Sequence, residues 1–207
     1  DSSQCTQASF LDYDKDGDLD VFMVVNPTDY TIFNVNSIRK KKIQGEAAST
    51  DKLYRNEGKG NFVDVSKEAG ILIEGYSLGL HAADFNGDHW PDIYVTNDFL
   101  SNDILYINQQ DGTFINEAAE AFKHTSIASM GMDVADLNND GYSEIFIADM
   151  YPESRAHEHM MMPGGDFNRF NYILKAGYEP QYSRNTLQFN HGDGTFSDIG
   201  QLAKVHK

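Results

Sequence analysis

Residues 84–92 read DFNGDHWPD, and this acidic stretch decides the fold because it separates two apolar runs and recurs along the chain. The apolar run before it, SLGLHAAD at residues 77–84, has a counterpart in SMGMDVAD at residues 129–136. Two further acidic stretches share its length and its alternation of acidic side chains, DYDKDGDLD at residues 12–20 and DLNNDGYSE at residues 136–144. The matched runs begin at residues 77 and 129, so the repeat is about 50 residues long. A repeat of about this length is typical of propellers and solenoids.

A second motif follows each acidic stretch. It reads LYRN at residues 53–56, LYIN at residues 105–108 and LQFN at residues 187–190, and each copy is followed by a glycine-containing turn and a phenylalanine. This pattern indicates a β-hairpin. One unit therefore reads strand, acidic loop, strand, turn, strand, glycine turn, strand, with almost no helical periodicity. Four strands in roughly 40–50 residues predict one propeller blade.

The sequence thus predicts an all-β protein built from three four-stranded antiparallel propeller blades. We expect one unit of 207 residues, with blades at about residues 1–70, 71–123 and 124–207. Two insertions, 27–52 and 151–184, are expected on one edge of the blades. Because closed propellers have at least about four blades, we expect a partial propeller or a segment of a longer one. Other chains or further blades would then complete it.

The acidic loops are candidate calcium sites. Calcium takes about six to eight oxygen ligands, and a tight loop supplies them from alternate residues, so we expect about three ions, one in each loop. The predicted side-chain ligands are Asp12, Asp14, Asp16 and Asp20 in the first loop, Asp84, Asn86, Asp88 and Asp92 in the second, and Asp136, Asn138, Asp140 and Glu144 in the third. The predicted main-chain ligands are the carbonyls of Asp18, Trp90 and Tyr142.

Two other interpretations of these loops are open. Asp/Asn-rich surface turns form without an ion. An EF-hand loop also begins with alternating acidic residues, but it ends on Glu at its twelfth position and lies between helices. Here the twelfth positions are Met23, Val95 and Ile147, all within apolar runs, which excludes the EF-hand. Two residues depart from the loop pattern. His89 replaces a glycine, and histidine tolerates a left-handed backbone conformation better than most residues do. Glu144 replaces the last aspartate.

Composition narrows the class of partner. The formal net charge is −16, and 22 Asp outnumber 10 Glu, as expected where acidity is concentrated in turns and metal loops. Such a surface repels phosphate backbones, so we expect no nucleic-acid partner. Cys5 is the only cysteine, which excludes an internal disulfide framework and a cysteine-based zinc site. The longest apolar run, residues 21–25, is far shorter than the roughly 20 residues of a membrane-spanning helix.

The repeated loops and hairpins resemble the FG-GAP or VCBS repeats of integrin-α-type propellers. Residues 76–205 are further similar to bacterial VCBS repeat proteins that often carry an ASPIC/UnbV domain. Residues 84–98, 124–131 and 184–188 carry that likeness. The resemblance implies a calcium-bound propeller of about seven blades, exported to the periplasm, the outer surface or the medium, and acting in adhesion or ligand binding.

Three functions remain open at this point. The first is a calcium-binding binding or scaffold module for a protein or glycan partner. The second is a carbohydrate-active enzyme, a lyase or hydrolase, which would need convergent catalytic groups. The sequence holds no catalytic motif beyond the repeat, so we expect no enzyme. The third is a lectin with a sugar site between blades.

Overall fold

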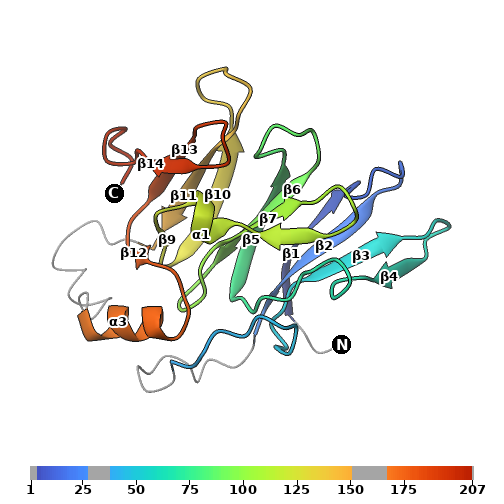
Figure 1. Ribbon diagram of the computed structural model, residues 1–207, viewed down its shortest axis with the longest axis horizontal. Coiled ribbons are helices and arrows are strands. Elements are labelled where there is room, and N and C mark those ends of the chain that lie inside the picture. The colour runs from blue at the N-terminus through green and yellow to red at the C-terminus, as the bar shows by residue number, and fades with distance from the viewer. Residues whose placement is uncertain (1–3, 28–37, 151–166, 207) are drawn as a thin grey trace.

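The computed structural model describes residues 4–27, 38–150 and 167–206. Three four-stranded antiparallel sheets stand side by side, as predicted (Figure 1). Blade 1 consists of β1 (Gln4–Leu11), β2 (Asp20–Asn26), β3 (Lys52–Asn56) and β4 (Phe62–Asp64). Blade 2 consists of β5 (Ser77–Ala83), β6 (Asp92–Asn97), β7 (Ile104–Asn108) and β8 (Phe114–Asn116). Blade 3 consists of β10 (Ser129–Ala135), β11 (Glu144–Asp149), β13 (Thr186–Asn190) and β14 (Phe196–Asp198).

Each blade follows the same register. The first strand carries an irregularity near its start, between Cys5 and Gln7, between Ser77 and Gly79, and between Ser129 and Gly131. Successive side chains point to opposite faces of a blade because the strands are pleated, so a blade can pack against a neighbour on either face. The acidic loops all join the first strand of a blade to its second and lie at one edge of the array (Figure 1). The twelfth loop positions lie in β2, β6 and β11, so the loops are flanked by strands.

The core between the blades consists of two layers, one between each pair of neighbouring blades, and a smaller third cluster joins Leu100 to Ile173 and Tyr178 of the second insertion. The first joins blade 1 to blade 2 through side chains such as Phe22, Leu53 and Tyr106. The second joins blade 2 to blade 3 through side chains such as Tyr94 and Ile145. Because blade 2 is covered on both faces, every residue of β6 and β7 is buried.

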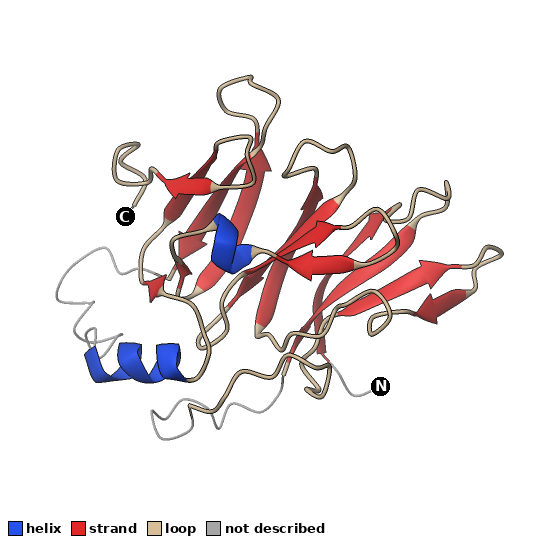
Figure 2. Ribbon diagram, viewed as in Figure 1, coloured by secondary structure: helices blue, strands red, loops and turns tan. Residues whose placement is uncertain are grey.

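Helices are few, and the sequence pattern did not predict them. The helix α1 (Ala118–Ala121) follows blade 2, and α3 (Phe167–Lys175) lies within the second insertion, at the edge opposite the acidic loops (Figure 2). A short parallel pair, β9 (Thr125–Ser126) with β12 (Gln181–Tyr182), links the start of blade 3 to the end of that insertion. Parts of both insertions, residues 28–37 and 151–166, lie outside the described residues. None of the described helices is long and apolar enough to cross a membrane.

Candidate metal centre

The three acidic loops share one backbone conformation. Their fourth positions have positive φ, at Lys15, Gly87 and Asn139, and so do their sixth positions, at Gly17, His89 and Gly141. The φ of His89 is 68°, so histidine occupies the left-handed conformation that glycine takes in the other two loops, as expected from the sequence. Two left-handed residues separated by one other residue turn the chain back sharply in each loop.

The first loop brings three carboxylates together. One oxygen each from Asp12, Asp14 and Asp20 lies within 4.8 Å of the others. Oδ1 of Asp12 is buried and has no hydrogen-bond partner. Burial raises the pKa of Asp14, and the neighbouring Asp16 raises it further. A hard cation would supply the missing partner and relieve the repulsion, so these residues fit calcium.

One predicted side-chain ligand of the first loop, Asp16, lies outside this cluster. The carboxylates of Asp16 and Asp18 are exposed, and Oδ1 of Asp16 accepts a hydrogen bond from the backbone nitrogen of Asp18 at 2.8 Å. Asp16 therefore shapes the turn. The orientation of the Asp18 side chain does not bear on its predicted role, which uses the main-chain carbonyl.

The second loop is held by hydrogen bonds between its own residues. Asp84 accepts from the backbone nitrogens of Gly87, Asp88 and His89, at 2.7, 3.1 and 2.7 Å. Asn86 Oδ1 accepts from the nitrogen of Asp88 at 3.0 Å. Among the described residues, only the first loop brings three acidic side chains within 4.8 Å of one another.

The third loop differs in its last ligand. Asp136 accepts from the backbone nitrogens of Asp140 and Gly141, at 3.2 and 3.0 Å. Asn138 Nδ2 donates to Oδ2 of Asp140 at 2.8 Å. Oε2 of Glu144 accepts from the nitrogen of Leu137 at 2.8 Å, whereas its Oε1 is buried without a hydrogen-bond partner. That oxygen also fits a cation.

The ninth loop position has a second task that the sequence analysis missed. In blade 2, Asp92 accepts from the backbone nitrogens of Phe85 and Asn108, both at 2.9 Å. In blade 1, Asp20 accepts in the same way from Tyr13 at 3.2 Å and Asn56 at 2.8 Å. The carboxylate thus joins its loop to the hairpin of its own blade. Burial raises the pKa of Asp92 to about 7.

A second set of buried acids caps the opposite edge of the blades. Oδ1 of Asp51 accepts from the backbone nitrogen of Val25, and Oδ1 of Asp103 accepts from that of Asn97, both at 2.8 Å. Asn185 holds this position in blade 3, and its Oδ1 accepts from the backbone nitrogen of Asp149 at 2.8 Å. The signal was present in the sequence, because each of these residues directly precedes a third strand.

The seventh residues of the second and third loops, Trp90 and Tyr142, each contact the preceding loop. The ammonium of Lys15 in the first loop lies 4.5 Å from the ring centroid of Trp90 in the second. The Tyr142 ring in the third loop lies so close to Gly87 and Gly192 that a Cβ on either glycine would approach it within 2.8 and 2.7 Å, respectively. These aromatic side chains therefore join neighbouring blades.

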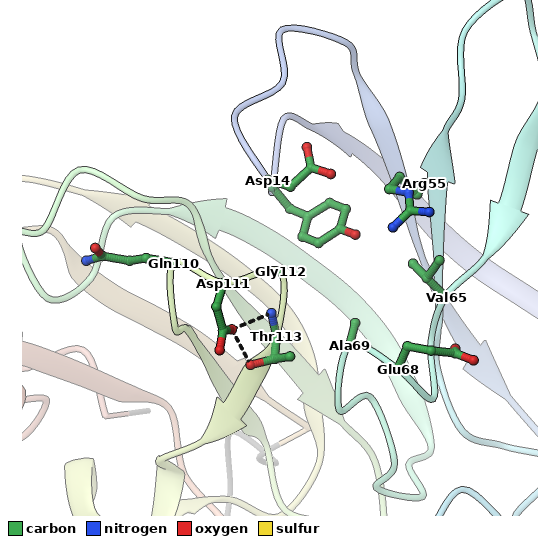
Figure 3. Close-up of a pocket in the computed structure, with 10 residues that line it drawn as sticks. Asp14, Arg55, Val65, Glu68, Ala69, Gln110, Asp111, Gly112 and Thr113 are labelled. Carbon is green, nitrogen blue, oxygen red and sulfur yellow. Dashed lines mark hydrogen bonds between the residues drawn. The ribbon is translucent and has the colours of Figure 1, made fainter.

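A polar cleft of about 400 Å³ opens beside the first loop, between blades 1 and 2 (Figure 3). Asp14, Arg55 and Glu68 line it from blade 1 and the residues that follow, and Gln110 and Thr113 line it from the hairpin turn of blade 2. Arg55 donates two hydrogen bonds to Glu57, at 2.8 and 2.6 Å. The cleft therefore offers amide, hydroxyl and carboxylate groups close to the candidate metal ligands.

The described parts of the two insertions contact each other. Lys41 Nζ lies 3.0 Å from Oε2 of Glu179. Buried Glu74, directly before blade 2, accepts hydrogen bonds from Arg39, from the backbone nitrogen of Lys42 and from the hydroxyl of Tyr178, at 2.8, 2.8 and 3.0 Å. Burial and the adjacent Glu74 raise the pKa of Tyr178. Glu74 is therefore the hub of an assembly between two segments distant in the sequence.

Comparison with known families agrees with this geometry. The model of the FG-GAP-like repeat matches residues 43–95 and again residues 84–147. The two matches overlap at the second acidic loop and together span about half of the 207 residues. A search among curated proteins finds no similar sequence.

Proposed function

Because this chain belongs to the FG-GAP-like repeat family, we propose that it is a calcium-binding propeller module that mediates protein or glycan interactions in an exported bacterial protein. Membership in this family favours a binding or scaffold module with propeller blades. Calcium, export and the nature of the partner go beyond it. Each of these is argued separately below.

The cluster of Asp12, Asp14 and Asp20 is the observation that carries the calcium proposal. Unit charges 4.8 Å apart repel by about 3 kcal/mol at an effective dielectric constant of 20. An ion among these carboxylates converts that cost into attraction and adds a partner for Oδ1 of Asp12. When bound, calcium supplies a structural crosslink within the loop. The repetition of the loop backbone extends the proposal to about three ions, with the ligands predicted in all three loops.

We propose export because the proposed calcium sites resemble those of extracellular modules. Sites of this kind in extracellular modules bind calcium with dissociation constants of about 0.1–1 mM, which suits a compartment rich in calcium. We place the protein in the periplasm, on the outer surface or in the medium. The proposal includes a relationship of residues 76–205 to bacterial VCBS repeat proteins that often carry an ASPIC/UnbV domain.

Binding is favoured over catalysis because the recurrent carboxylates already have tasks. Those of the loops are candidate ligands or accept backbone hydrogen bonds, and those of the opposite edge cap strands, as Asp51 and Asp103 do. A lectin function is the second candidate, and the polar cleft beside Asp14 favours it. Binding to a glycan array that is lost in Gln110→Ala would support the lectin. Polysaccharide cleavage abolished by one carboxylate substitution outside the loops would support an enzyme.

Thermal unfolding with and without calcium tests the proposal. An ion at about 100 times its dissociation constant stabilises a protein by about 2.7 kcal/mol, so calcium should raise the melting temperature by several degrees and a chelator should reverse the rise. Magnesium, which prefers a rigid octahedral site, should do less. Asp14→Asn should reduce the shift. Asp111→Asn, which changes an exposed aspartate outside the loops, should not. A melting temperature indifferent to calcium would refute the proposal.

A further inference from the structure

Two described segments of the insertions carry a local excess of positive charge. Residues 38–46 and 170–184 hold six Lys and Arg against two Glu, whereas the whole chain holds 16 Lys and Arg against 32 Asp and Glu. Both segments lie at the edge opposite the acidic loops (Figure 1). The protein therefore has a basic surface region remote from its acidic loops, which the net charge of −16 conceals.

The two segments meet at the C-terminal end of α3. The backbone nitrogen of Lys41 donates to the carbonyl of Ala176 at 2.9 Å. This contact places Lys40 and Lys42, which flank Lys41, beside Lys175, which directly precedes Ala176. Three cationic residues that are distant in the sequence thus come from neighbouring stretches of backbone.

Both segments are anchored on blade 2. Ile38 packs against buried Leu100 and Ile173, and Leu100 lies between β6 and β7. The backbone nitrogen of Lys42 donates to Oε1 of Glu74 at 2.8 Å, and its carbonyl accepts from the nitrogen of Glu74 at 3.0 Å. The backbone of this region is therefore held in place before any ligand arrives, which lowers the cost of ordering it on binding.

Two of the cations serve to hold the segments. Arg39 lies 2.7 Å from Oε2 of Glu74, and Nζ of Lys41 lies 3.0 Å from Oε2 of Glu179. The Lys41 side chain is only 7% exposed. Arg39 and Lys41 are therefore engaged within the protein and offer little positive charge to a ligand.

The remaining cations are available to a partner. Lys40 and Lys175 are exposed and Lys42 is half-buried, and no ion pair joins any of these three to another residue that the structure describes. Tyr172 is 55% exposed and precedes Lys175 by three residues in α3, so the two side chains lie on one face of the helix. We call Lys40, Lys42, Tyr172 and Lys175 the basic patch.

We propose that the basic patch binds an acidic polysaccharide, a chain of sugars that carries carboxylate or sulfate groups. This inference deepens the binding function proposed above and rests on it for the class of partner. A lysine ammonium is a compact point charge on a flexible stem, so three of them suit anionic groups spaced along a polymer. The exposed ring of Tyr172 combines an apolar face with a hydroxyl group, a pairing that suits a sugar ring.

The acidic loops do not prevent this contact, because salt screens their charge. The strands β5 and β10 have seven residues each. A strand rises about 3.3 Å per residue, so the two edges of a blade are about 23 Å apart. The Debye length is about 8 Å at physiological ionic strength. The exposed carboxylate of Glu46 lies in the same segment as Lys40 and Lys42, but the three ammonium groups outnumber it.

Other anionic partners suit the basic patch less well. An acidic peptide usually adds to a sheet edge or lies in a groove, whereas the polar cleft of this protein lies beside the first acidic loop. An anionic membrane favours a helix with a free apolar face. In α3, which has nine residues, Ile173 is instead buried against the protein.

Titration of fluorescently labelled dextran sulfate with the 207-residue chain in calcium, followed by anisotropy, tests the proposal. Neutral dextran of the same length is the matched control. We expect saturable binding to dextran sulfate and none to neutral dextran, with an affinity that falls by about tenfold between about 50 and 300 mM salt. Absence of binding to dextran sulfate, equal binding to both polymers, or an affinity independent of salt would overturn the proposal.

Variants locate the binding site. The double variant Lys40→Gln/Lys42→Gln should bind dextran sulfate about tenfold or more weakly than the unmodified chain. The control Lys59→Gln/Lys67→Gln removes the same charge from exposed lysines outside the insertions and should change the affinity less than about twofold. Equal losses for the two double variants would overturn the proposal. Should the first variant fold poorly, Lys175→Gln alone should weaken binding by about fivefold, and an unchanged affinity would overturn the proposal.

Two further probes test the choice of partner. Polyglutamate and phosphatidylglycerol vesicles should bind more weakly than dextran sulfate at equal anionic charge, and tighter binding of either, lost in Lys40→Gln/Lys42→Gln, would overturn the assignment to a polysaccharide. The melting temperature in calcium separates this inference from the calcium proposal. A chain that melts higher in calcium but ignores dextran sulfate would overturn only the present inference. A chain that binds dextran sulfate but is indifferent to calcium would overturn only the calcium proposal.

Discussion

A carboxylate oxygen of Asp92 lies 2.9 Å from the backbone nitrogen of Asn108, so the acidic loop of blade 2 holds the hairpin of the same blade. The other oxygen of Asp92 accepts from Phe85 at the start of the loop. The carboxylate therefore holds the start of the acidic loop close to the end of β7. This arrangement makes the ninth loop position a structural element whether or not an ion is bound.

Asp92→Ala should destabilise the protein strongly. Removing the carboxylate leaves two buried backbone donors, those of Phe85 and Asn108, without a partner. Each costs about 1–3 kcal/mol, so the free energy of unfolding in urea should fall by about 2–6 kcal/mol. Asp111→Ala is the control, because Asp111 is exposed and caps only Thr113 in a turn. Equal losses for the two variants would contradict the structural role of Asp92.

Asn108→Asp should weaken the junction between blades 1 and 2. The substitution keeps an acceptor for Gln110 but places a carboxylate oxygen near the carbonyl of Tyr13, where an amide now donates at 2.8 Å. We expect a loss of about 2–4 kcal/mol in unfolding free energy. The matched control is Asn56→Asp. The side-chain amide of Asn56 donates a hydrogen bond to the carbonyl of Leu19, and this bond is exposed and lies within one blade. The control should lose less than about 1 kcal/mol, and the reverse order would contradict the role assigned to Asn108.

Asp51→Asn should change how stability depends on pH. Burial raises the pKa of Asp51 to about 7, so the folded state holds a proton that the unfolded state releases near pH 4. Stability from this group is therefore fully present below about pH 4 and is lost as pH rises towards 7. The variant should melt at a higher temperature than the unmodified protein at pH 8, and the gap should shrink at pH 5.5.

The third blade supports this substitution. Asn185 holds the same position and caps the strand at 2.8 Å with an amide oxygen, so asparagine at position 51 should keep the hydrogen bond to Val25. Melting temperatures at the two pH values, both in calcium, provide the measurement. A gap that is constant between pH 5.5 and pH 8 would show that Asp51 does not titrate in this range.

Glu74→Ala should release the first insertion. The buried carboxylate pairs with Arg39, whose Nη2 lies 2.7 Å from Oε2, so its removal leaves the cation and the Tyr178 hydroxyl without their partner. Because the Arg39 side chain is 40% exposed, the main loss comes from the buried Tyr178 hydroxyl, and an unsatisfied buried group costs about 1–3 kcal/mol. Trypsin should then cleave faster at residues 39–42, as followed by gel electrophoresis. Exposed Glu46, in the same segment, is the control, and equal rates for Glu74→Ala and Glu46→Ala would contradict the role of Glu74.

The blades could be predicted from the sequence because each one solves the same packing problem with the same residues. The apolar second strands, which contain Phe22, Tyr94 and Phe146, recur in every unit, and so does the glycine turn after Asn56 and its counterparts. The position of His89 in a left-handed conformation also follows from the repeat.

Contacts that do not repeat could not be predicted. The ion pair of Lys41 with Glu179 joins residues 138 positions apart, and neither residue belongs to the repeated pattern. The hydrogen bonds that Asp20 and Asp92 accept from backbone nitrogens could not be predicted for a different reason. A pattern of alternating acids shows which side chains converge, but it does not show which backbone donors lie behind them.

The central claim is tested most directly by anomalous diffraction at long wavelength from crystals grown in millimolar calcium. The account predicts an anomalous peak enclosed by Asp12, Asp14 and Asp20, with further peaks in the loops that end at Asp92 and Glu144. Ordered density for the first loop with no peak among its three carboxylates would contradict the account.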